Sequence, residues 1–183
     1  MTTRERIFFC RLSFDLKIAA ARADYHLHLY EPDVDRDGFD IFMEDPEGGK
    51  IWVQTKAVLS SAKTSNWTTF TEFLRPQIEY MDKYHLSPME CGRGGGIILI
   101  EIDASTADGN VSYYYTDYRV LNALAARFIV KEQEAQSGRG RPPNPVQSVA
   151  ERLLREIRDG ERTTEISVPR SVFLKVKEPD GLL

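Results

Sequence analysis

The chain has 183 residues, of which 42% are hydrophobic, so it is long enough to bury one substantial core. Its 24 lysines and arginines against 28 aspartates and glutamates give a net charge of -4, which disfavours coating of nucleic acid by bulk positive charge. No apolar run approaches the ~20 residues of a spanning helix, and Cys10 and Cys91 lack a CxxC partner. We therefore expect a soluble, cytoplasmic, single-domain protein with no membrane partner.

The first third of the chain predicts a helix followed by three strands. Apolar residues recur every three or four positions from Thr3 to Ala23, which is the spacing of one helix face. The following segments alternate between apolar and polar residues, as half-buried strands do. The expected elements are a helix over 3–23, strands over 25–30, 39–44 and 51–58, an acidic loop over 31–38 and a turn over 45–49.

The rest of the chain predicts further helices and strands. The residues from Thr69 to Glu72 have capping-box spacing, which opens a helix that runs toward Tyr84 with a kink at Pro76. The other expected elements are a polar loop over 60–69, a glycine-rich connection over 92–96, strands over 97–102, 111–115 and 165–176, helices over 120–136 and 146–158, and a linker over 137–145. The strand over 97–102 is apolar enough to be buried on both faces. This order predicts an α/β domain with a mixed sheet, with a core over about 5–135 and a C-terminal extension over 146–178.

The hairpin over 39–58 is the most informative stretch. The period-two rule places Gln54 and Lys56 on one face of their strand. If the hairpin reverses about Glu47, paired residue numbers sum to twice 47, and Asp40 lies opposite Gln54 at a Cβ separation of roughly 4.5 to 5.5 Å. A carboxylate, an amide and an ammonium group would then converge.

Such a trio suits the hydrolysis of a phosphodiester. The carboxylate and amide oxygens are hard ligands for Mg²⁺ or Mn²⁺, the metal lowers the pKa of a bound water, and the ammonium group orients the nucleophile and offsets phosphate charge. The spacing alone also fits a simpler interpretation. In that case Asp40 ends a turn, Gln54 is a polar strand residue and Lys56 is an exposed edge charge.

A family resemblance is carried by the sequence DGFDIFM over 37–43 and by WVQTKA over 52–57, which follow a helix and a strand. This arrangement resembles the PD-(D/E)xK nuclease superfamily, particularly its Mrr-like branch of small restriction-endonuclease-like domains with a GxD…QxK signature. The likeness covers about residues 5 to 105. It implies a restriction-endonuclease-like three-layer fold, in which helices flank a central mixed sheet, and a metal-dependent endonuclease activity, with a role in defence or restriction.

The resemblance also implies roles for single residues. Asp40 resembles the metal-binding aspartate, Gln54 the variable Glu/Gln ligand and Lys56 the catalytic lysine of the family. In the family, the backbone carbonyl at the position of Thr55 often completes the metal shell. Many members also carry a glutamate on the first helix, and its nearest counterpart here is Asp15, which is either a metal ligand or the salt-bridge partner of Arg11. Because Gln54 replaces a glutamate, the site has one negative charge fewer and we expect weaker metal binding.

Other acidic and histidine residues are weaker candidates. Asp33 follows Pro32 in a literal PD pair, but Asp40 is preferred because it lies on the strand opposite Gln54. Asp35 and Asp37 are turn residues or ligands of a second metal. His26 and His28 have an H-x-H spacing that zinc enzymes use, but they lack a third ligand with a clear spacing and indicate a solvated strand face.

Contacts to a nucleic acid are expected outside the trio. The hydroxyl-rich segment after the hairpin and the linker supply side chains that would bind phosphates without reading bases. These are Lys63, Ser60, Ser61, Arg139 and Arg141. Four tyrosines, Tyr113, Tyr114, Tyr115 and Tyr118, either stack on bases or pack within the sheet.

Three functions follow from these patterns. The first is a Mg²⁺- or Mn²⁺-dependent endonuclease that acts on nucleic acid, with DNA favoured, and that forms a homodimer because cleavage of two strands usually needs two copies. The second is a module with the nuclease fold and little or no catalysis, which binds nucleic acid or a protein. The third is a hydrolase of another phosphate ester.

Overall fold

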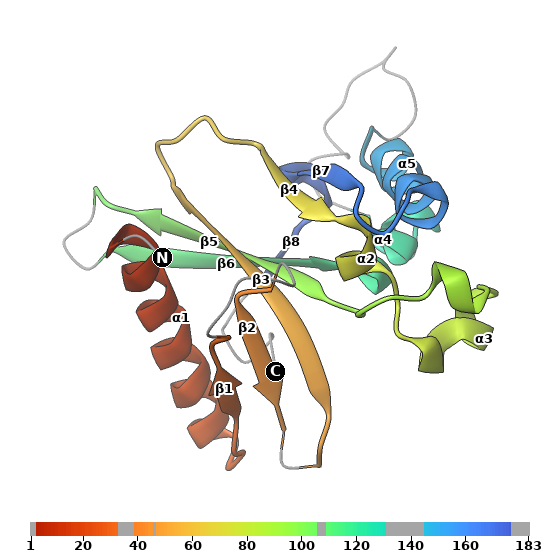
Figure 1. Cartoon of the computed structure of the whole chain (residues 1–183). Coiled ribbons are helices and arrows are strands. Elements are labelled where there is room, and N and C mark those ends of the chain that lie inside the picture. Colours follow the sequence, from red (N-terminus) through yellow and green to blue (C-terminus); the bar gives the residue numbers. More distant parts are fainter. Residues whose placement is uncertain (1–2, 33–38, 46, 106–108, 131–144, 177–183) are drawn as a thin grey trace. The chain divides into compact units, whose positions relative to one another are not determined.

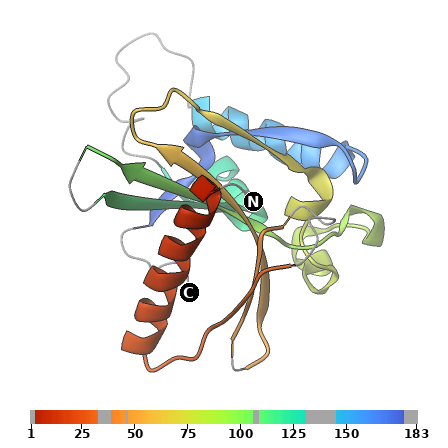
Figure 2. The ribbon, with the colours of Figure 1, turned by 60° about the vertical axis from the view of Figure 1, so that its left-hand side comes forward.

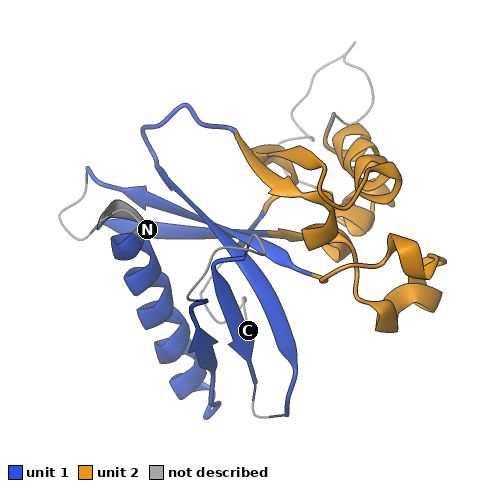
Figure 3. Ribbon diagram, in the orientation of Figure 1, with its two compact units in different colours: residues 1–65, 95–115, 174–183 blue, residues 66–94, 116–173 orange. Residues whose placement is uncertain are grey.

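The computed structural model describes residues 3–32, 39–45, 47–105, 109–130 and 145–176. It divides the chain into two compact units, each assembled from segments that are separated in sequence (Figure 3). Unit 1 comprises residues 1–65, 95–115 and 174–183, and unit 2 comprises residues 66–94 and 116–173. This division differs from the expected one, a core over 5–135 with a C-terminal extension. Among the described residues, no helix is both long enough and apolar enough to cross a membrane.

Unit 1 is an α/β unit built on a mixed sheet (Figure 1). The sheet has six strands in the order β1-β2-β3-β5-β6-β8. Strands β3 and β5 are parallel, whereas β1 with β2, β2 with β3, and β6 with β8 are antiparallel. The elements are α1 (Thr3–Arg22), β1 (His28–Tyr30), β2 (Ile41–Glu44), β3 (Lys50–Leu59), β5 (Gly96–Asp103), β6 (Asn110–Asp117) and β8 (Leu174–Val176). The last two residues of β6 belong to unit 2.

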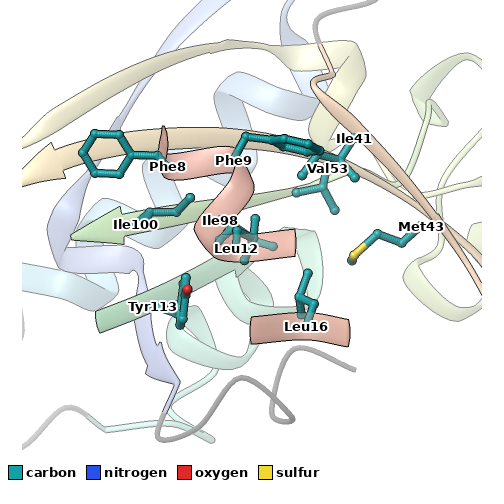
Figure 4. Close-up of a cluster of buried hydrophobic side chains, with 10 residues drawn as sticks. All are labelled: Phe8, Phe9, Leu12, Leu16, Ile41, Met43, Val53, Ile98, Ile100 and Tyr113. Carbon is teal, nitrogen blue, oxygen red and sulfur yellow. The ribbon is translucent and has the colours of Figure 1, made fainter. Parts of the chain in front are cut away.

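Helix α1 lies along one face of this sheet (Figure 2). Its side chains Phe8, Leu12 and Leu16 are at most 4% exposed. They belong to one buried cluster with Val53 of β3 and Ile98 of β5, among others (Figure 4). The predicted apolar face of the helix is therefore confirmed, and the predicted bounds agree with the observed ones to within one residue.

Strand β5 forms the apolar centre of the sheet. Its residues from Ile97 to Ile100 point alternately to the two faces, yet each is at most 1% exposed. The prediction that this strand is buried on both faces is confirmed. Strand β3 beside it is mixed in character, because Val53 is fully buried whereas Gln54 and Lys56 are half-buried.

Unit 2 combines helices with a small sheet. Strands β4 and β7 pair in antiparallel fashion, and α4 packs against α5. Buried aromatic and aliphatic side chains fill the interior, and the rings of Trp67 and Phe173 meet edge to face at 5.5 Å. The elements are β4 (Asn66–Phe70), α2 (Thr71–Leu74), η1 (Ile78–Tyr80), α3 (Met81–Tyr84), η2 (Pro88–Glu90), α4 (Tyr118–Ala125), α5 (Pro145–Asp159), β7 (Glu165–Pro169) and η4 (Arg170–Val172).

Several sequence predictions fail within unit 2. The expected loop over 60–69 ends in a strand, because residues from Asn66 onward pair with a segment a hundred residues later. The expected helix over 69–84 is broken into α2, η1 and α3, and Pro76 follows the end of α2. A capping box does form, but at Ser87 and Glu90 rather than at Thr69. The expected strand over 165–176 is interrupted by η4, so its two halves join different sheets.

The helix expected over 120–136 is shorter. It begins at Tyr118, where Asp117 caps it by accepting a hydrogen bond from the Val120 N–H, and it ends at Ala125. Arg127, shortly after this end, adopts a left-handed backbone with φ of 58°. The later part of the predicted helix, from 131, and the linker over 137–144 lie outside the described residues.

Candidate functional site

The register of the β2–β3 hairpin brings the predicted trio into one region. Ile41 pairs with Val53 and Glu44 pairs with Lys50, so the paired residue numbers sum to twice 47, as the sequence predicts. Asp40 directly precedes β2, and its backbone N–H donates to the Val53 carbonyl at 2.9 Å. The paired register itself ends at Ile41 and Val53, so Asp40 lies beside β3 at the start of β2, and its pairing with Gln54 stays a prediction.

Asp40 is held by Thr55. Its Oδ2 accepts hydrogen bonds from the Thr55 backbone N–H at 2.6 Å and from the Thr55 hydroxyl at 2.9 Å. The carboxylate thus takes the place of a ladder carbonyl where β2 begins, and two donors fix its position. For Thr55 the structure gives a positioning contact through its N–H and hydroxyl, and metal binding through its carbonyl stays a prediction.

Gln54 and Lys56 lie on the face of β3 that is turned away from α1. Val53, which precedes Gln54 on β3, packs in the α1 cluster, and strand alternation sends its even-numbered neighbours to the other side. On β5, Gln54 is registered with Ile97 and Lys56 with Leu99, both fully buried. The two polar side chains therefore lie beside a dry surface, where electrostatic interactions are stronger than in water.

The Gln54 side chain carries one of three buried polar atoms that have no hydrogen-bond partner among the described residues, the others being the hydroxyls of Thr69 and Thr116 in unit 2. In Gln54 this atom is the amide Oε1. Buried amide oxygens are nearly always paired, and leaving one unpaired costs about 1 to 3 kcal/mol. An acceptor of this kind beside a carboxylate is a suitable ligand for a hard cation.

Asp15 belongs to a different cluster. Its Oδ2 accepts a hydrogen bond from the Tyr113 hydroxyl at 2.5 Å and from Arg11 Nε at 2.9 Å. Burial, with the Asp15 carboxylate as the next contribution, raises the pKa of Tyr113, and the hydrogen bond to Asp15 raises the pKa of Arg11. Tyr113 packs in the α1 cluster, so the structure does not bring Asp15 to the face that carries Gln54. The salt-bridge interpretation is the one that the contacts support.

An aromatic row lies on the same face as Gln54. The Phe42 ring is 4.5 Å from that of Trp52 and 5.9 Å from that of Tyr30, and the Lys50 ammonium lies 5.7 Å from the Phe42 ring centre. Sequence reasoning did not single out this row. The signal was present, because the predicted hairpin register also pairs Phe42 with Trp52.

The expected nucleic-acid contacts are only partly described. Ser60, Ser61 and Lys63 follow the end of β3 and are exposed, so they are accessible to a ligand. Arg139 and Arg141 lie outside the described residues, as do Asp33, Asp35 and Asp37. The tyrosines Tyr113 and Tyr118 are buried, at 4% and 9% exposure, which favours packing over base stacking for these two.

The histidines on β1 and just before it agree with the prediction of a solvated strand face. His26 and His28 are both exposed, and Leu27 and Leu29 between and after them pack against the core. Within the part of the chain that the structure describes, no group of three or more His, Cys, Asp or Glu side chains is arranged to hold a metal ion. Any metal site on the trio therefore depends on the amide of Gln54 as well as on Asp40.

The chain matches no protein-family model and no curated protein at a significant level.

Proposed function

We propose that this protein is a metal-dependent nuclease in which Asp40 and Gln54 hold Mg²⁺ or Mn²⁺ and Lys56 assists the attack of water on a phosphodiester. The observation that carries the proposal is the buried, unpartnered Oε1 of Gln54, on the strand whose next residue, Thr55, binds the carboxylate of Asp40. A protein tolerates such an atom most readily where a ligand completes its coordination. DNA is the proposed substrate.

Each residue of the proposed site has a separate role in catalysis. Thr55 orients the Asp40 carboxylate with two hydrogen bonds, as outer partners do for metal ligands. Lys56 lies on the same strand face as Gln54. Its ammonium group would therefore lie close to the scissile phosphate and orient the attacking water. When bound, the metal would lower the pKa of a water molecule and offset the charge of the phosphate.

We also propose that the fold of unit 1 is restriction-endonuclease-like. The support is the order of its elements: α1 and β1 precede the hairpin that carries the trio, and β3 then pairs with the buried parallel strand β5. This order agrees with the family that the GxD…QxK signature resembles. Dimerisation would follow from double-strand cleavage and is part of the same proposal.

Metal binding is the first test. We expect Mn²⁺ to bind the wild-type chain in a calorimetric titration and to bind Asp40→Asn at least tenfold more weakly, since a carboxylate ligand is lost. Glu44→Gln is a matched control, because Glu44 lies at the far end of β2, which Asp40 precedes, and pairs with Lys50 at 3.5 Å. Equal affinities of wild type and Asp40→Asn would contradict the proposed metal site.

Cleavage is the second test. Supercoiled plasmid incubated with Mg²⁺ or Mn²⁺ should be nicked by wild type, and Lys56→Ala should reduce the rate by roughly 10² or more. Lys83→Ala removes an exposed lysine of unit 2 that has no expected role in the site and should retain most of the rate. Nicking that survives in Lys56→Ala, or that proceeds in EDTA, would contradict this mechanism.

A second function is favoured by the small number of acidic ligands. Asp15, the other acid expected in the site, is bound to Arg11 and Tyr113, which leaves Asp40 as the described carboxylate of the trio. A site with one carboxylate and one amide binds divalent cations weakly. A nuclease-fold module that binds nucleic acid or a protein without cleavage is therefore the alternative. Retained DNA binding with no cleavage at any Mg²⁺ or Mn²⁺ concentration would select it.

A further inference from the structure

Helix α1 has a second apolar face that points away from the sheet. Ile7, Phe14 and Ile18 are 60%, 62% and 39% exposed, and we call them the apolar stripe. At 3.6 residues per turn they fall within about 40° of one another around the helix and span about 16 Å along it. They lie opposite the buried side chains of Phe9 and Leu16. Exposed apolar residues aligned in this way mark interaction surfaces more often than isolated ones do.

The stripe is bordered by basic residues on both sides. Helical periodicity places Arg11 and Arg22 on one side of it and Arg6 and Lys17 on the other, and all four are exposed. Asp15, the acidic residue between Arg6 and Arg22, is half-buried and bonded to Arg11. Every exposed residue over 6–22 is therefore apolar or basic, although the whole chain has a net charge of -4.

We propose that this face of α1 docks on an anionic phospholipid surface. An interfacial helix places Ile and Phe at the acyl boundary and its Arg and Lys side chains among the headgroups, which is the pattern observed here. Each basic residue near an anionic leaflet adds to the attraction. The proposal concerns binding to the surface, for which a membrane-spanning helix is not required.

The geometry of α1 favours a flat, anionic lipid surface over a protein groove, a second copy of the chain or a nucleic acid. Because the inner half of the helix is packed on its own sheet, a groove that encloses a helix cannot reach around it. A second copy of α1, packed on this stripe in either direction, would bring basic residues of the two copies close together, which is repulsive. A nucleic acid would satisfy the basic border but would leave the apolar stripe against polar phosphates.

Vesicle flotation tests the proposal directly. Wild type should float with vesicles of phosphatidylcholine that contain about 30% phosphatidylserine and remain unbound with phosphatidylcholine alone. Raising the NaCl concentration from about 0.1 M to about 0.5 M should release most of the bound protein, since salt screens the basic border. If wild type does not float with the anionic vesicles, the proposal is overturned.

Two serine variants test the apolar stripe. Phe14→Ser should reduce partitioning into the anionic vesicles by about tenfold, because it removes the central apolar contact. Phe128→Ser is the matched control, since Phe128 is 87% exposed but lies in unit 2. Equal loss in both variants, or no loss in Phe14→Ser, overturns the proposal. So does a lipid-free wild-type dimer that Phe14→Ser converts to a monomer, because the stripe would then belong to a second copy.

A fluorophore reports whether α1 itself contacts the lipid. Cys10 is exposed on the outward face, and Cys91, the only other cysteine, is buried. An environment-sensitive dye on Cys10 should gain intensity and shift to the blue with anionic vesicles. Flotation without any change in dye emission would place the contact elsewhere and overturn the assignment to α1.

Discussion

Two buried polar groups, one in each unit, differ in whether the fold supplies them with hydrogen-bond partners. In unit 2, Arg75 is 4% exposed, and its guanidinium donates hydrogen bonds to four backbone carbonyls, three of which belong to Ile157, Arg158 and Gly160 at the end of α5. In unit 1, the buried Oε1 of Gln54 has no partner among the described residues.

The difference distinguishes a polar group that stabilises the fold from one that is left available for a ligand. Arg75 needs no carboxylate, because the carbonyl end of a helix carries partial negative charge and its last carbonyls lack partners within the helix. Every one of its contacts is explained by the fold. Gln54 gains nothing comparable from the fold, so its oxygen lowers stability unless a ligand binds it. Substitutions at four positions can break or sharpen this comparison.

Replacement of Arg75 should have the largest effect on stability. Arg75→Met keeps the bulk of the side chain but leaves several buried carbonyls without donors, and we expect a loss of about 3 kcal/mol or more in the free energy of unfolding. Urea unfolding followed through Trp67 reports on unit 2, provided that Trp52 is replaced by Phe.

Arg152→Met is the control for this experiment. Arg152 lies on α5 but is exposed and forms a surface pair with Glu156 at 3.4 Å, which is worth about 0.5 kcal/mol. If Arg75→Met and Arg152→Met shift the urea midpoint equally, the buried guanidinium does not stabilise the end of α5.

The second largest effect is expected at the Tyr113–Asp15 contact. Tyr113→Phe removes a 2.5 Å hydrogen bond to a half-buried carboxylate, and we expect a loss of about 2 kcal/mol at neutral pH. Tyr30→Phe is the control, because Tyr30 is 48% exposed. A midpoint shift no larger than that of Tyr30→Phe would show that the Asp15 cluster is dispensable.

The same contact predicts a dependence on alkaline pH. Because burial and Asp15 raise the pKa of Tyr113 in the folded chain, the folded state holds this proton more tightly than the unfolded state does. The associated stability is complete below the ordinary tyrosine pKa of about 10 and is lost as the pH rises above it. Urea midpoints from neutral pH to about pH 11 should therefore fall less steeply in Tyr113→Phe than in wild type.

Local sequence pattern was sufficient for the hairpin and for α1. Strand alternation and a turn centred on Glu47 fix the register, so the pairing of Ile41 with Val53 and of Phe42 with Trp52 followed from the sequence. Helical spacing likewise identified the buried face of α1. Both features depend on residues that are close together in the chain.

Long-range contacts account for what the sequence could not predict. Strand β4 forms by pairing with β7, about a hundred residues later, and no local signal distinguishes it from a loop. Asp15 is bound by Tyr113, 98 positions away, so spacing to Arg11 alone left its role open. The expected long helix after Thr69 failed because a capping pattern carries less weight than Pro76. The burial of the Gln54 oxygen is also a tertiary property.

A smaller effect is expected from Thr55→Val, which keeps the shape of the side chain and the backbone N–H but removes the hydroxyl that binds Asp40. We expect Mn²⁺ affinity to fall by about tenfold, since outer-shell partners orient metal ligands. Unfolding without metal should change by only about 1 kcal/mol. Thr55→Ser, which retains the hydroxyl, should restore most of the affinity. Unaltered affinity in Thr55→Val would remove Thr55 from the site.

Gln54→Leu should have the smallest effect on stability, and of the opposite sign. Because it removes a buried oxygen that has no partner, metal-free Gln54→Leu should be as stable as wild type or more stable by about 1 kcal/mol, while metal binding is lost. Gln54→Glu should do the reverse: a buried carboxylate destabilises the metal-free chain, and saturating Mg²⁺ should raise its melting temperature more than that of wild type. If metal shifts neither wild type nor Gln54→Glu, then the unpaired oxygen is not a metal ligand, and the contrast with Arg75 would reflect packing alone.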